Sequence, residues 1–220
     1  MSFSWKGLRV LITSGPTKEF LDPVRFITNA SSGKMGWALA AEAWRLGAKV
    51  TVVSGPVSTP PPGKILVQWV ETAIEMRNQV LKLAKKADLI VSAAAVTDWR
   101  PKKFSPNKIK RREGEVHLAL VPNPDIIGEI GKIKKKSGAK ERKFPVLVGF
   151  ALETHDLERA ALKKMREKNL DMIVANSPAS LSSERIRATL FLKTGVKKKL
   201  SLTTKRLCAR SIFNEIEDFL

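Results

Sequence analysis

The sequence predicts an α/β protein built on a single, mostly parallel sheet that helices cover on both faces. Three observations lead to this fold class. Short β-rich runs alternate with helical runs through the first hundred residues, and such alternation is typical of parallel sheets. Two later β-rich runs flank Thr194-Gly195, which indicates a β-hairpin extension. Neither a repeat nor a linker divides the chain, so we expect one domain over residues 1–220.

The first half of the chain supplies strands and helices in turn. A β-rich run ends where Ser14-Gly15-Pro16-Thr17 breaks it, and Gly47 stops the first helix. Thr72 and Glu75 have the spacing of a capping box, which opens a helix that reaches about Lys86. We expect strands at 8–13, 49–53, 65–70 and 89–95, and helices at 37–46 and 73–86.

The second half begins less regularly. Residues 97–112 are polar, basic and contain prolines, which favours a loop, and residues 115–120 alternate like an exposed strand. Asn123 is typical of a helix cap, with Pro124 at the first helical position. We then expect strands at 146–150 and 172–175, a helix at 156–168, hairpin strands at 189–192 and 199–202, and a closing helix at 204–219.

The net charge of +19 could indicate nucleic-acid binding. Aromatic residues for base stacking are sparse, however, and the chain contains no tyrosine. Anionic small molecules also favour a basic protein, so the charge supports anionic ligands without choosing among them. Much of it lies in one run, which is typical of a solvated loop or helix end: Lys132, Lys134, Lys135, Lys136, Lys140, Arg142 and Lys143.

Several functional classes are disfavoured by what the chain lacks. The chain has one cysteine, Cys208, so it cannot form an internal disulfide, and we expect this cysteine to be buried in a helix. The two histidines, His117 and His155, lack neighbours at metal-ligand spacing, and the Gly-x-Ser-x-Gly elbow of many hydrolases is absent. The start resembles no signal peptide, and no apolar run approaches the ~20 residues that cross a bilayer. We therefore expect a cytoplasmic protein that does not bind a membrane.

Polar segments follow the carboxyl ends of several predicted strands. These segments are 13–36, 93–110 and 150–154, and Asn176 ends a further strand. Ligands of open parallel sheets bind at this edge, so we expect one site there.

Within these segments, the residues alone leave alternatives open. Residues 29–36 place serines and glycines before a helix, which suits an anion site or simply a turn, and they match neither G-x-G-x-x-G nor a Walker A loop. Asp98 suits a hydroxyl, a metal or a helix cap. Residues 108–112 suit a triphosphate-binding loop or a solvated loop. Lys164 and Lys168 lie one turn apart on the same helix face, which is also typical of lysines that merely face solvent.

The order of the motifs goes further. Ser31-Ser32-Gly33-Lys34-Met35-Gly36, Ala93-Ala94-Ala95-Val96-Thr97-Asp98 and Lys108-Ile109-Lys110 resemble segments of the phosphopantothenate–cysteine ligase family, also called phosphopantothenoylcysteine synthetase. Each motif is weak alone, but together they occur in family order across nearly the whole chain. The resemblance also rests on residues 11–17, 21–29, 52–57, 123–126, 148–154 and 168–171.

The resemblance implies a reaction in two halves. The carboxylate of 4'-phosphopantothenate attacks the α-phosphate of CTP, which releases pyrophosphate and leaves an acyl-cytidylate. The amine of L-cysteine then attacks this intermediate, which gives phosphopantothenoylcysteine and CMP in coenzyme A biosynthesis. Bacterial relatives use CTP, eukaryotic relatives tolerate ATP, and Mg²⁺ accompanies the triphosphate. The implied fold mixes Rossmann-like and ribokinase-like topology, in a homodimer with the active site at the interface.

The resemblance also implies roles for individual residues. Asn29 and Lys108 correspond to catalytic residues, and Arg25 corresponds to an arginine that reaches the substrate phosphate across the dimer. The loop here reads Lys-x-Lys-Arg, with Arg111 in place of the family's last lysine. Phosphopantothenate binding is implied for Arg25, Asn29, Ala94, Ala95 and Asp98. Nucleotide binding is implied for Gly15, Ser31, Gly33, Gly36, Ser92, Ala93, Ala94, Asp98, Lys108, Pro124, Asp125, Ile126, Ile127, Phe150, Lys164, Lys168 and Asn176. No metal ligand is assigned.

In bacteria this ligase is usually the C-terminal half of a bifunctional protein whose N-terminal half is a flavin-dependent decarboxylase. The resemblance covers only the ligase half, so we expect no flavin on this chain, which is either a stand-alone enzyme or an excised domain. A phosphopantothenoylcysteine decarboxylase on a separate chain is a candidate partner. Two rival hypotheses remain from the residues. One is a nucleic-acid-binding protein, which rests on the charge alone. The other is an NAD(P)-dependent reductase, which is disfavoured because this sequence lacks the G-x-G-x-x-G fingerprint.

Overall fold

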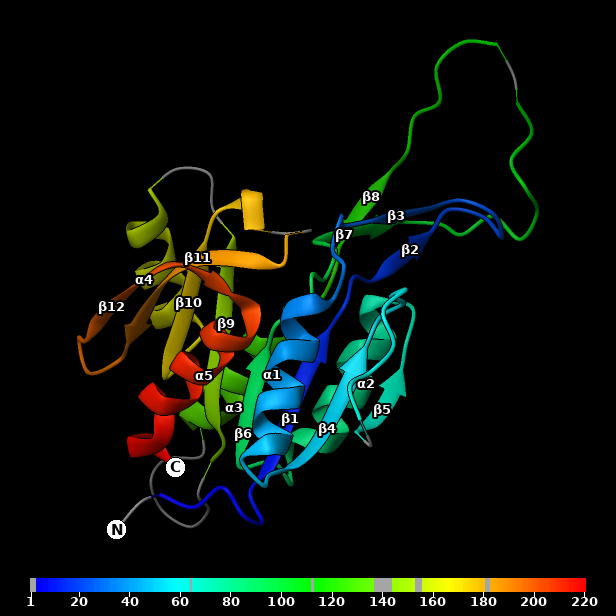
Figure 1. The fold of residues 1–220 in the computed structure, drawn as a ribbon. Coiled ribbons are helices and arrows are strands. Elements are labelled where there is room, and N and C mark those ends of the chain that lie inside the picture. The colour runs from blue at the N-terminus through cyan, green and yellow to red at the C-terminus, as the bar shows by residue number, and fades with distance from the viewer. Residues whose placement is uncertain (1–2, 64, 112, 137–143, 153–155, 181–182) are drawn as a thin grey trace.

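The computed structural model describes residues 3–63, 65–111, 113–136, 144–152, 156–180 and 183–220. Within these ranges an eight-stranded sheet forms the centre of the fold, in the order β12-β11-β10-β9-β6-β1-β4-β5 (Figure 1). The strands are β1 (Arg9–Ser14), β4 (Lys49–Ser54), β5 (Leu66–Trp69), β6 (Leu89–Ser92), β9 (Val146–Leu152), β10 (Met172–Asn176), β11 (Arg185–Leu192) and β12 (Lys197–Thr204).

Six neighbouring strands of this sheet are parallel, namely β5, β4, β1, β6, β9 and β10 in sheet order. Numbered along the chain, their order is 3-2-1-4-5-6, the order of the doubly wound dinucleotide-binding sheets. Strands β11 and β12 extend this sheet as an antiparallel hairpin. The predicted fold class, a mostly parallel sheet with a hairpin extension, is therefore confirmed.

Helices cover both faces of the sheet, because the central strands are apolar on both sides. In β1, Ile12 packs in the core beneath α1 (Lys34–Arg45) and α5 (Lys205–Ile216), whereas Leu11 packs in the core on the opposite face. That opposite face is covered by α2 (Ala73–Ala84), α3 (Ile126–Lys136) and α4 (Leu157–Glu167). Short 3₁₀ turns occupy Pro178–Ser180 and Glu217–Phe219.

A second structure projects from the carboxyl edge of the sheet, and we call it the arm (Figure 1). It consists of the described parts of residues 18–28 and 99–122. Strands β2 (Lys18–Phe20) and β3 (Phe26–Thr28) form one antiparallel hairpin, and β7 (Trp99–Pro101) pairs with β8 (Leu120–Pro122) in another. Between β7 and β8 the chain extends far from the sheet (Figure 1).

The arm is where the sequence predictions of local structure were wrong. The predicted strand at 115–120 is instead a three-residue strand, β8, and residues 115–119 form none. The backbone N–H of Lys102 donates to the carbonyl of Ala119 at 2.8 Å, so pairing continues one residue beyond β8, and residues 115–118 lie in the projecting loop (Figure 1). The predicted loop at 97–112 contains β7, and the hairpin β2–β3 was not predicted, because three-residue strands show no usable periodicity.

Three smaller corrections concern the ends of elements. Strand β6 ends at Ser92 rather than Ala95, since the backbone N–H of Ala94 donates to Thr13 Oγ1 at 3.1 Å. Helix α3 begins after Asp125, whose Oδ1 accepts from the backbone N–H of Gly128 at 3.2 Å. Asp125 is therefore the cap in place of the predicted Asn123, and Pro124 precedes the helix.

The predicted capping box at α2 forms only in part. Thr72 Oγ1 accepts from the backbone N–H of Glu75 at 3.2 Å, as predicted. Glu75 Oε2 accepts instead from the backbone N–H of Glu71, at 2.8 Å. None of the helices in the described ranges is long and apolar enough to cross a membrane. The predictions for Lys140, Arg142, Lys143, His155 and residues 153–154 fall outside the described residues.

Candidate functional site

A cavity of about 820 Å³ opens at the carboxyl edge of the parallel strands. Its walls come from the ends of β6, β9 and β10 and from the first residues of α1, α3 and α5. The sequence predicted a site at this edge, because the polar segments that follow parallel strands meet there.

Most of the residues that the sequence analysis singled out line this cavity, whereas Gly15, Arg25 and Lys108 are not among its described lining residues. The predicted residues that line it are Asn29, Ser31, Gly33, Gly36, Ser92, Ala93, Ala94, Ala95, Asp98, Pro124, Asp125, Ile126, Ile127, Phe150, Lys164, Lys168 and Asn176.

The start of α1 packs directly on the end of β1. Gly33, at the N-cap, has a φ of 72°, a conformation that favours glycine. A Cβ on Gly36 would lie 2.2 Å from Ser14 Oγ, so only glycine allows this approach of helix to strand. Ser14 Oγ in turn donates to the carbonyl of Gly33 at 3.2 Å. The first backbone N–H groups of α1 are therefore held at the cavity, in an arrangement that suits an anion.

Residues 93–97 form the wall between β6 and the arm, and the loop after β1 holds them in place. The backbone N–H of Ala95 donates to the carbonyl of Gly15 at 2.9 Å. Gly15 therefore lies behind this wall and supports it. Asn29 Nδ2 donates to the carbonyls of Ala95 and Val96, both at 3.1 Å. With its amide nitrogen used in this way, Asn29 offers a ligand its carbonyl oxygen, which is an acceptor.

The α3 and α4 side of the cavity carries two lysines. Lys164 Nζ donates to the carbonyl of Phe150, at the end of β9, at 2.8 Å. Lys168 Nζ forms an ion pair with Asp125 Oδ1 at 2.7 Å. Both ammonium groups are thus tied to groups that also line the cavity, so a ligand bound there would meet positioned charges.

Arg25 lies in the arm instead of in the cavity. Its guanidinium pairs with the buried carboxylate of Asp22 and donates to the carbonyl of Ile109, both at 2.5 Å. Asp22 Oδ2 also accepts from the backbone N–H of Ile109 at 3.0 Å. Burial by itself would raise the pKa of Asp22, but the hydrogen bonds from Ile109, Val24 and Arg25 outweigh it and hold that pKa well below its usual range.

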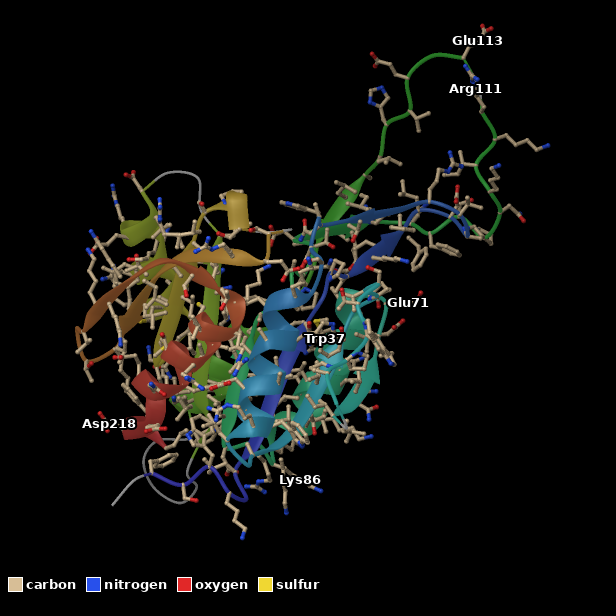
Figure 2. The ribbon with its side chains drawn as sticks, viewed as in Figure 1. Trp37, Glu71, Lys86, Arg111, Glu113 and Asp218 are labelled. Atoms are coloured by element: carbon tan, nitrogen blue, oxygen red, sulfur yellow. The ribbon has the colours of Figure 1, made fainter. Side chains whose placement is uncertain are left out.

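Lys108 and Lys110 flank this contact and are exposed to solvent. The chain beyond them runs further outward, and Figure 2 shows Arg111 and Glu113 near the far tip of the loop. Asp22 therefore fixes the base of the loop through Ile109, while Lys108 and Lys110 are not among the described residues that line the cavity of their own chain.

The structure adds cavity residues that the sequence analysis did not propose. The most buried charged one is Lys205, which begins α5 and is 6% exposed. Lys34, which begins α1, lines the same side. Lys34 lies within the Ser-Ser-Gly-Lys-Met-Gly motif and could have been proposed from it. Lys205 showed no signal in the sequence, because it lies more than a hundred residues beyond that motif.

Two further chemically reactive residues that the structure describes, Cys208 and His117, are not among the residues that line the cavity. Cys208 is buried in α5, as predicted, and this burial raises the pKa of its thiol to about 12. His117 is exposed in the arm, with Nε2 3.7 Å from Glu115 Oε2. In the part of the chain that the structure describes, no group of three or more His, Cys, Asp or Glu side chains is placed to hold a metal ion.

Comparison with known families and curated proteins gives a consistent result. The family described as the DNA/pantothenate metabolism flavoprotein C-terminal domain matches residues 5–220. The coenzyme A biosynthesis bifunctional protein CoaBC of Bacillus subtilis (strain 168) is 42% identical over 217 residues, which are 96% of this chain and 51% of that protein. The chain therefore spans about half the length of the curated relatives it matches.

Two solved structures are also similar. The crystal structure of the C-terminal domain of CoaBC has a TM-score of 0.81 and 38% identity, and the match covers 99% of this chain and 98% of that one. A more distant protein, solved in complex with phosphopantothenate-cysteine, has a TM-score of 0.76 over 96% of this chain and 86% of that one. At 17% identity this second likeness concerns the fold alone.

Proposed function

The chain belongs to the DNA/pantothenate metabolism flavoprotein C-terminal domain family, and from that premise we propose that it is a phosphopantothenate–cysteine ligase of coenzyme A biosynthesis. It joins 4'-phosphopantothenate to L-cysteine through an acyl-nucleotide intermediate. CTP is the nucleotide we expect, with ATP as the alternative. The observation that carries the proposal is the gathering of the predicted residues around one cavity, from elements that are far apart in the sequence.

The size and charge of the cavity support this reaction. Ligand sites commonly have volumes of about 300–1,000 Å³, and this cavity lies toward the upper end of that range. Lysines stand on both sides of it: Lys164 and Lys168 beside α4, and Lys34 and Lys205 at the starts of α1 and α5. A site of this kind suits two phosphorylated substrates better than it suits a neutral one.

In the first half-reaction, a carboxylate oxygen of phosphopantothenate bonds to the α-phosphorus of the nucleotide. The bond from that phosphorus to the bridging oxygen breaks, and pyrophosphate leaves with the electron pair. The residues that line the cavity act here mainly by positioning. Lys164, Lys168 and Phe150 hold the nucleoside, while Asn29 and the wall at 93–97 hold the pantothenate.

In the second half-reaction, the amine nitrogen of cysteine attacks the acyl carbon. The new C–N bond replaces the C–O bond to the nucleotide, which leaves as CMP, and the amine gives up a proton. Water would hydrolyse the intermediate, so the site must exclude it at this stage. We assign two roles in this half-reaction to Lys108: it closes the site, and it balances the charge of the departing phosphate.

Magnesium fits the cavity only as a partner of the phosphates. Mg²⁺ is commonly held by substrate phosphates together with one or two carboxylates. Two carboxylates are found among the described lining residues, Asp98 and Asp125, and Asp125 is already paired with Lys168. Asp98 is therefore the residue that suits the ion, which would supply positive charge to the triphosphate.

We propose that the active unit is a homodimer. Arg25 and Lys108 lie on the arm, outside the cavity of their own chain, so a second copy is needed to bring an arm over each site. The arm also exposes large apolar side chains, which marks an interaction surface. These are Val24, Phe26, Trp99, Phe104, Val116, Leu118 and Leu120.

The experiment is a pyrophosphate-release assay with phosphopantothenate and Mg²⁺, run with CTP or ATP and with or without cysteine. We expect pyrophosphate with the preferred nucleotide, and phosphopantothenoylcysteine only when cysteine is added. Mass spectrometry identifies the product and the nucleoside monophosphate. Folded protein that forms no product with either nucleotide would rule out the ligase.

A further inference from the structure

Lys34 and Lys205, on the α1 and α5 side of the cavity, are placed to bind one particular part of a ligand. Helices α1 and α5 pack side by side, and both begin at the cavity. Lys34 is the first residue of α1, and Lys205 is the first residue of α5. Both line the cavity, with the side chain of Lys34 31% exposed and Lys205 almost completely buried.

Among the residues that the structure describes, the carboxylate of Glu184 lies beside these two ammonium groups. Lys34 Nζ forms an ion pair with Glu184 Oε1, and the backbone N–H of Lys205 donates to the carbonyl of Glu184 at 3.2 Å. The side chain of Glu184 is 76% exposed and is not among the described residues that line the cavity. The cluster of two lysines and one glutamate therefore keeps a net positive charge, and its positive members face the cavity.

The electrostatic environment of Lys205 agrees with that excess. Burial lowers the pKa of its ammonium group, and repulsion from Lys34 lowers it further. Attraction to Glu184 and to the side chain of Cys208 opposes these effects without cancelling them. An anion in this part of the cavity would relieve the repulsion between the two lysines, so the site favours a negatively charged ligand.

The position of the cluster indicates which anion. Lys164 and Lys168 lie on the α3 and α4 face of the sheet, whereas Lys34 and Lys205 lie on the α1 and α5 face, with the ends of β6, β9 and β10 between them. The ammonium groups of Lys164 and Lys168 already contact the Phe150 carbonyl and the Asp125 carboxylate. A ligand that spans the cavity is therefore elongated, with its negative charge at the Lys34 and Lys205 end. A nucleoside triphosphate has this form: its nucleoside occupies the first side, and its phosphates extend past the start of α1 to the second.

We propose that Lys205 and Lys34 bind the two terminal phosphates of the nucleoside triphosphate, the group that leaves as pyrophosphate. The inference rests on the proposed function and assigns a residue pair to its leaving group. When the bond between the α-phosphorus and the bridging oxygen breaks, that oxygen keeps the electron pair and the pyrophosphate gains negative charge. Two ammonium groups already in place stabilise this charge without reorganisation.

The test is direct binding of inorganic pyrophosphate and of CMP to the full chain, measured by calorimetry. Lys205→Met should weaken pyrophosphate binding roughly 10–100-fold, the usual effect of removing a charged hydrogen bond. CMP lacks the terminal phosphates, so its affinity should stay within about twofold of the parent value. Lys205→Arg, which keeps the charge, should retain more of the pyrophosphate affinity than Lys205→Met.

Lys86→Met is the matched control, because Lys86 is exposed at the end of the molecule far from the cavity (Figure 2). It should leave both affinities unchanged. If Lys205→Met fails to fold by circular dichroism, Lys34→Met makes the same test and should weaken pyrophosphate binding alone. Equal losses for pyrophosphate and CMP, or an unchanged pyrophosphate affinity in the folded variant, would overturn the proposal.

Alkaline pH provides a second readout. The pKa of Lys205 is lowered from 10.5, so its ammonium group loses its proton at a lower pH than that of an ordinary lysine. Pyrophosphate binding should therefore begin to weaken at that lower pH. Lys205→Met should lose that part of the pH dependence, which a purely structural role would not produce. Binding needs no turnover, so the two proposals can fail separately. Parent protein that binds pyrophosphate through Lys205 but forms no product would contradict only the ligase, whereas active Lys205→Met with parental affinity would contradict only this inference.

Discussion

The cavity and the arm are held in place in opposite ways. The cavity wall at 93–97 is fixed from behind by Thr13 and Gly15 and from the front by Asn29. It therefore inherits the rigidity of the buried sheet. The arm reaches beyond the sheet, and Asp22 is the buried charge that ties its hairpin to the loop through Ile109. The difference agrees with the proposed dimer, in which one chain supplies the walls of each cavity and the arm of a second copy acts on it.

The predicted site residues are divided between these two regions according to their proposed roles. Residues with positioning roles in the proposed reaction line the cavity, whereas Arg25 and Lys108 lie on the arm. Trp99 and Phe104 are 52% and 56% exposed there and belong to the set of apolar side chains that the arm exposes. A partner's cavity would bring the two groups of residues together. Substitutions in the arm test this division, and substitutions in either region test how rigidly it is held.

The largest effect is expected from Arg25→Ala. Truncating one partner of a close charge pair typically costs about 2–5 kcal/mol, and here the loss should appear in the KM for phosphopantothenate and in kcat/KM. Asn29→Ala should also inactivate the enzyme. Mixing the two variants should restore about a quarter of the parent activity, since half of the two-fold dimers would then contain one intact site.

Subunit exchange must be measured in the same mixture, for example with differently tagged chains. A mixture that exchanges freely and stays inactive would show that Arg25 acts within its own chain. That result would remove the distinction between the arm and the cavity.

The next effect concerns Lys108→Gln, which tests the role of the arm in the second half-reaction. The variant should still form the acyl-nucleotide but should transfer it to cysteine about 10²–10³-fold more slowly, by analogy with the loss of an oxyanion-hole donor. Rapid quenching followed by mass spectrometry measures the accumulated intermediate. Lys103→Gln, an exposed lysine of the same arm, is the matched control and should react at the parent rate. A Lys108→Gln variant that forms no intermediate would place Lys108 in nucleotide binding or the first half-reaction.

A smaller effect, on stability, tests the rigidity of the cavity. Gly36→Ala places a Cβ 2.2 Å from Ser14 Oγ and 2.4 Å from Ser14 Cβ, so helix or strand must shift. Overpacking of this kind should lower the free energy of unfolding by about 1–3 kcal/mol. Urea denaturation measures this loss. The double variant Ser14→Gly with Gly36→Ala should recover part of it, because the two closest atoms are then absent. Strictly additive losses would mean that the two residues do not press on each other.

The smallest effect is local and concerns Asp22→Asn in the arm. Loss of the carboxylate should speed amide exchange at Ile109 while leaving the Ala95 amide, which bonds to Gly15, unchanged. Acid should act in the same way on the parent protein. The folded pKa of Asp22 lies below the unfolded value of 3.8, so its stabilisation is complete above 3.8 and is lost as the pH falls through the folded pKa. Amide NMR spectra between pH 6 and acid measure both changes. Equal exchange at Ile109 in variant and parent would show that Asp22 does not anchor the loop.

The sequence by itself was enough for the central fold and for much of the site. Buried strands such as β1 and β10 contain short apolar runs, and Gly47 follows the end of α1 as predicted, because apolar patterning and turn chemistry are local properties. The polar segments after these strands were expected to converge, since parallel strands all end at one edge. The motif around Gly33 and Gly36 was placed correctly at the start of a helix.

Only the tertiary structure decided the rest. Lys34, Glu184 and Lys205 meet because α1 and α5 lie side by side, and no local pattern encodes that meeting. The end of β6 depends on Thr13, some eighty residues earlier, and the arm depends on a contact from Asp22 to Ile109. Local sequence determines which residues become strand or helix, whereas the order of strands in the sheet determines which distant side chains share a cavity.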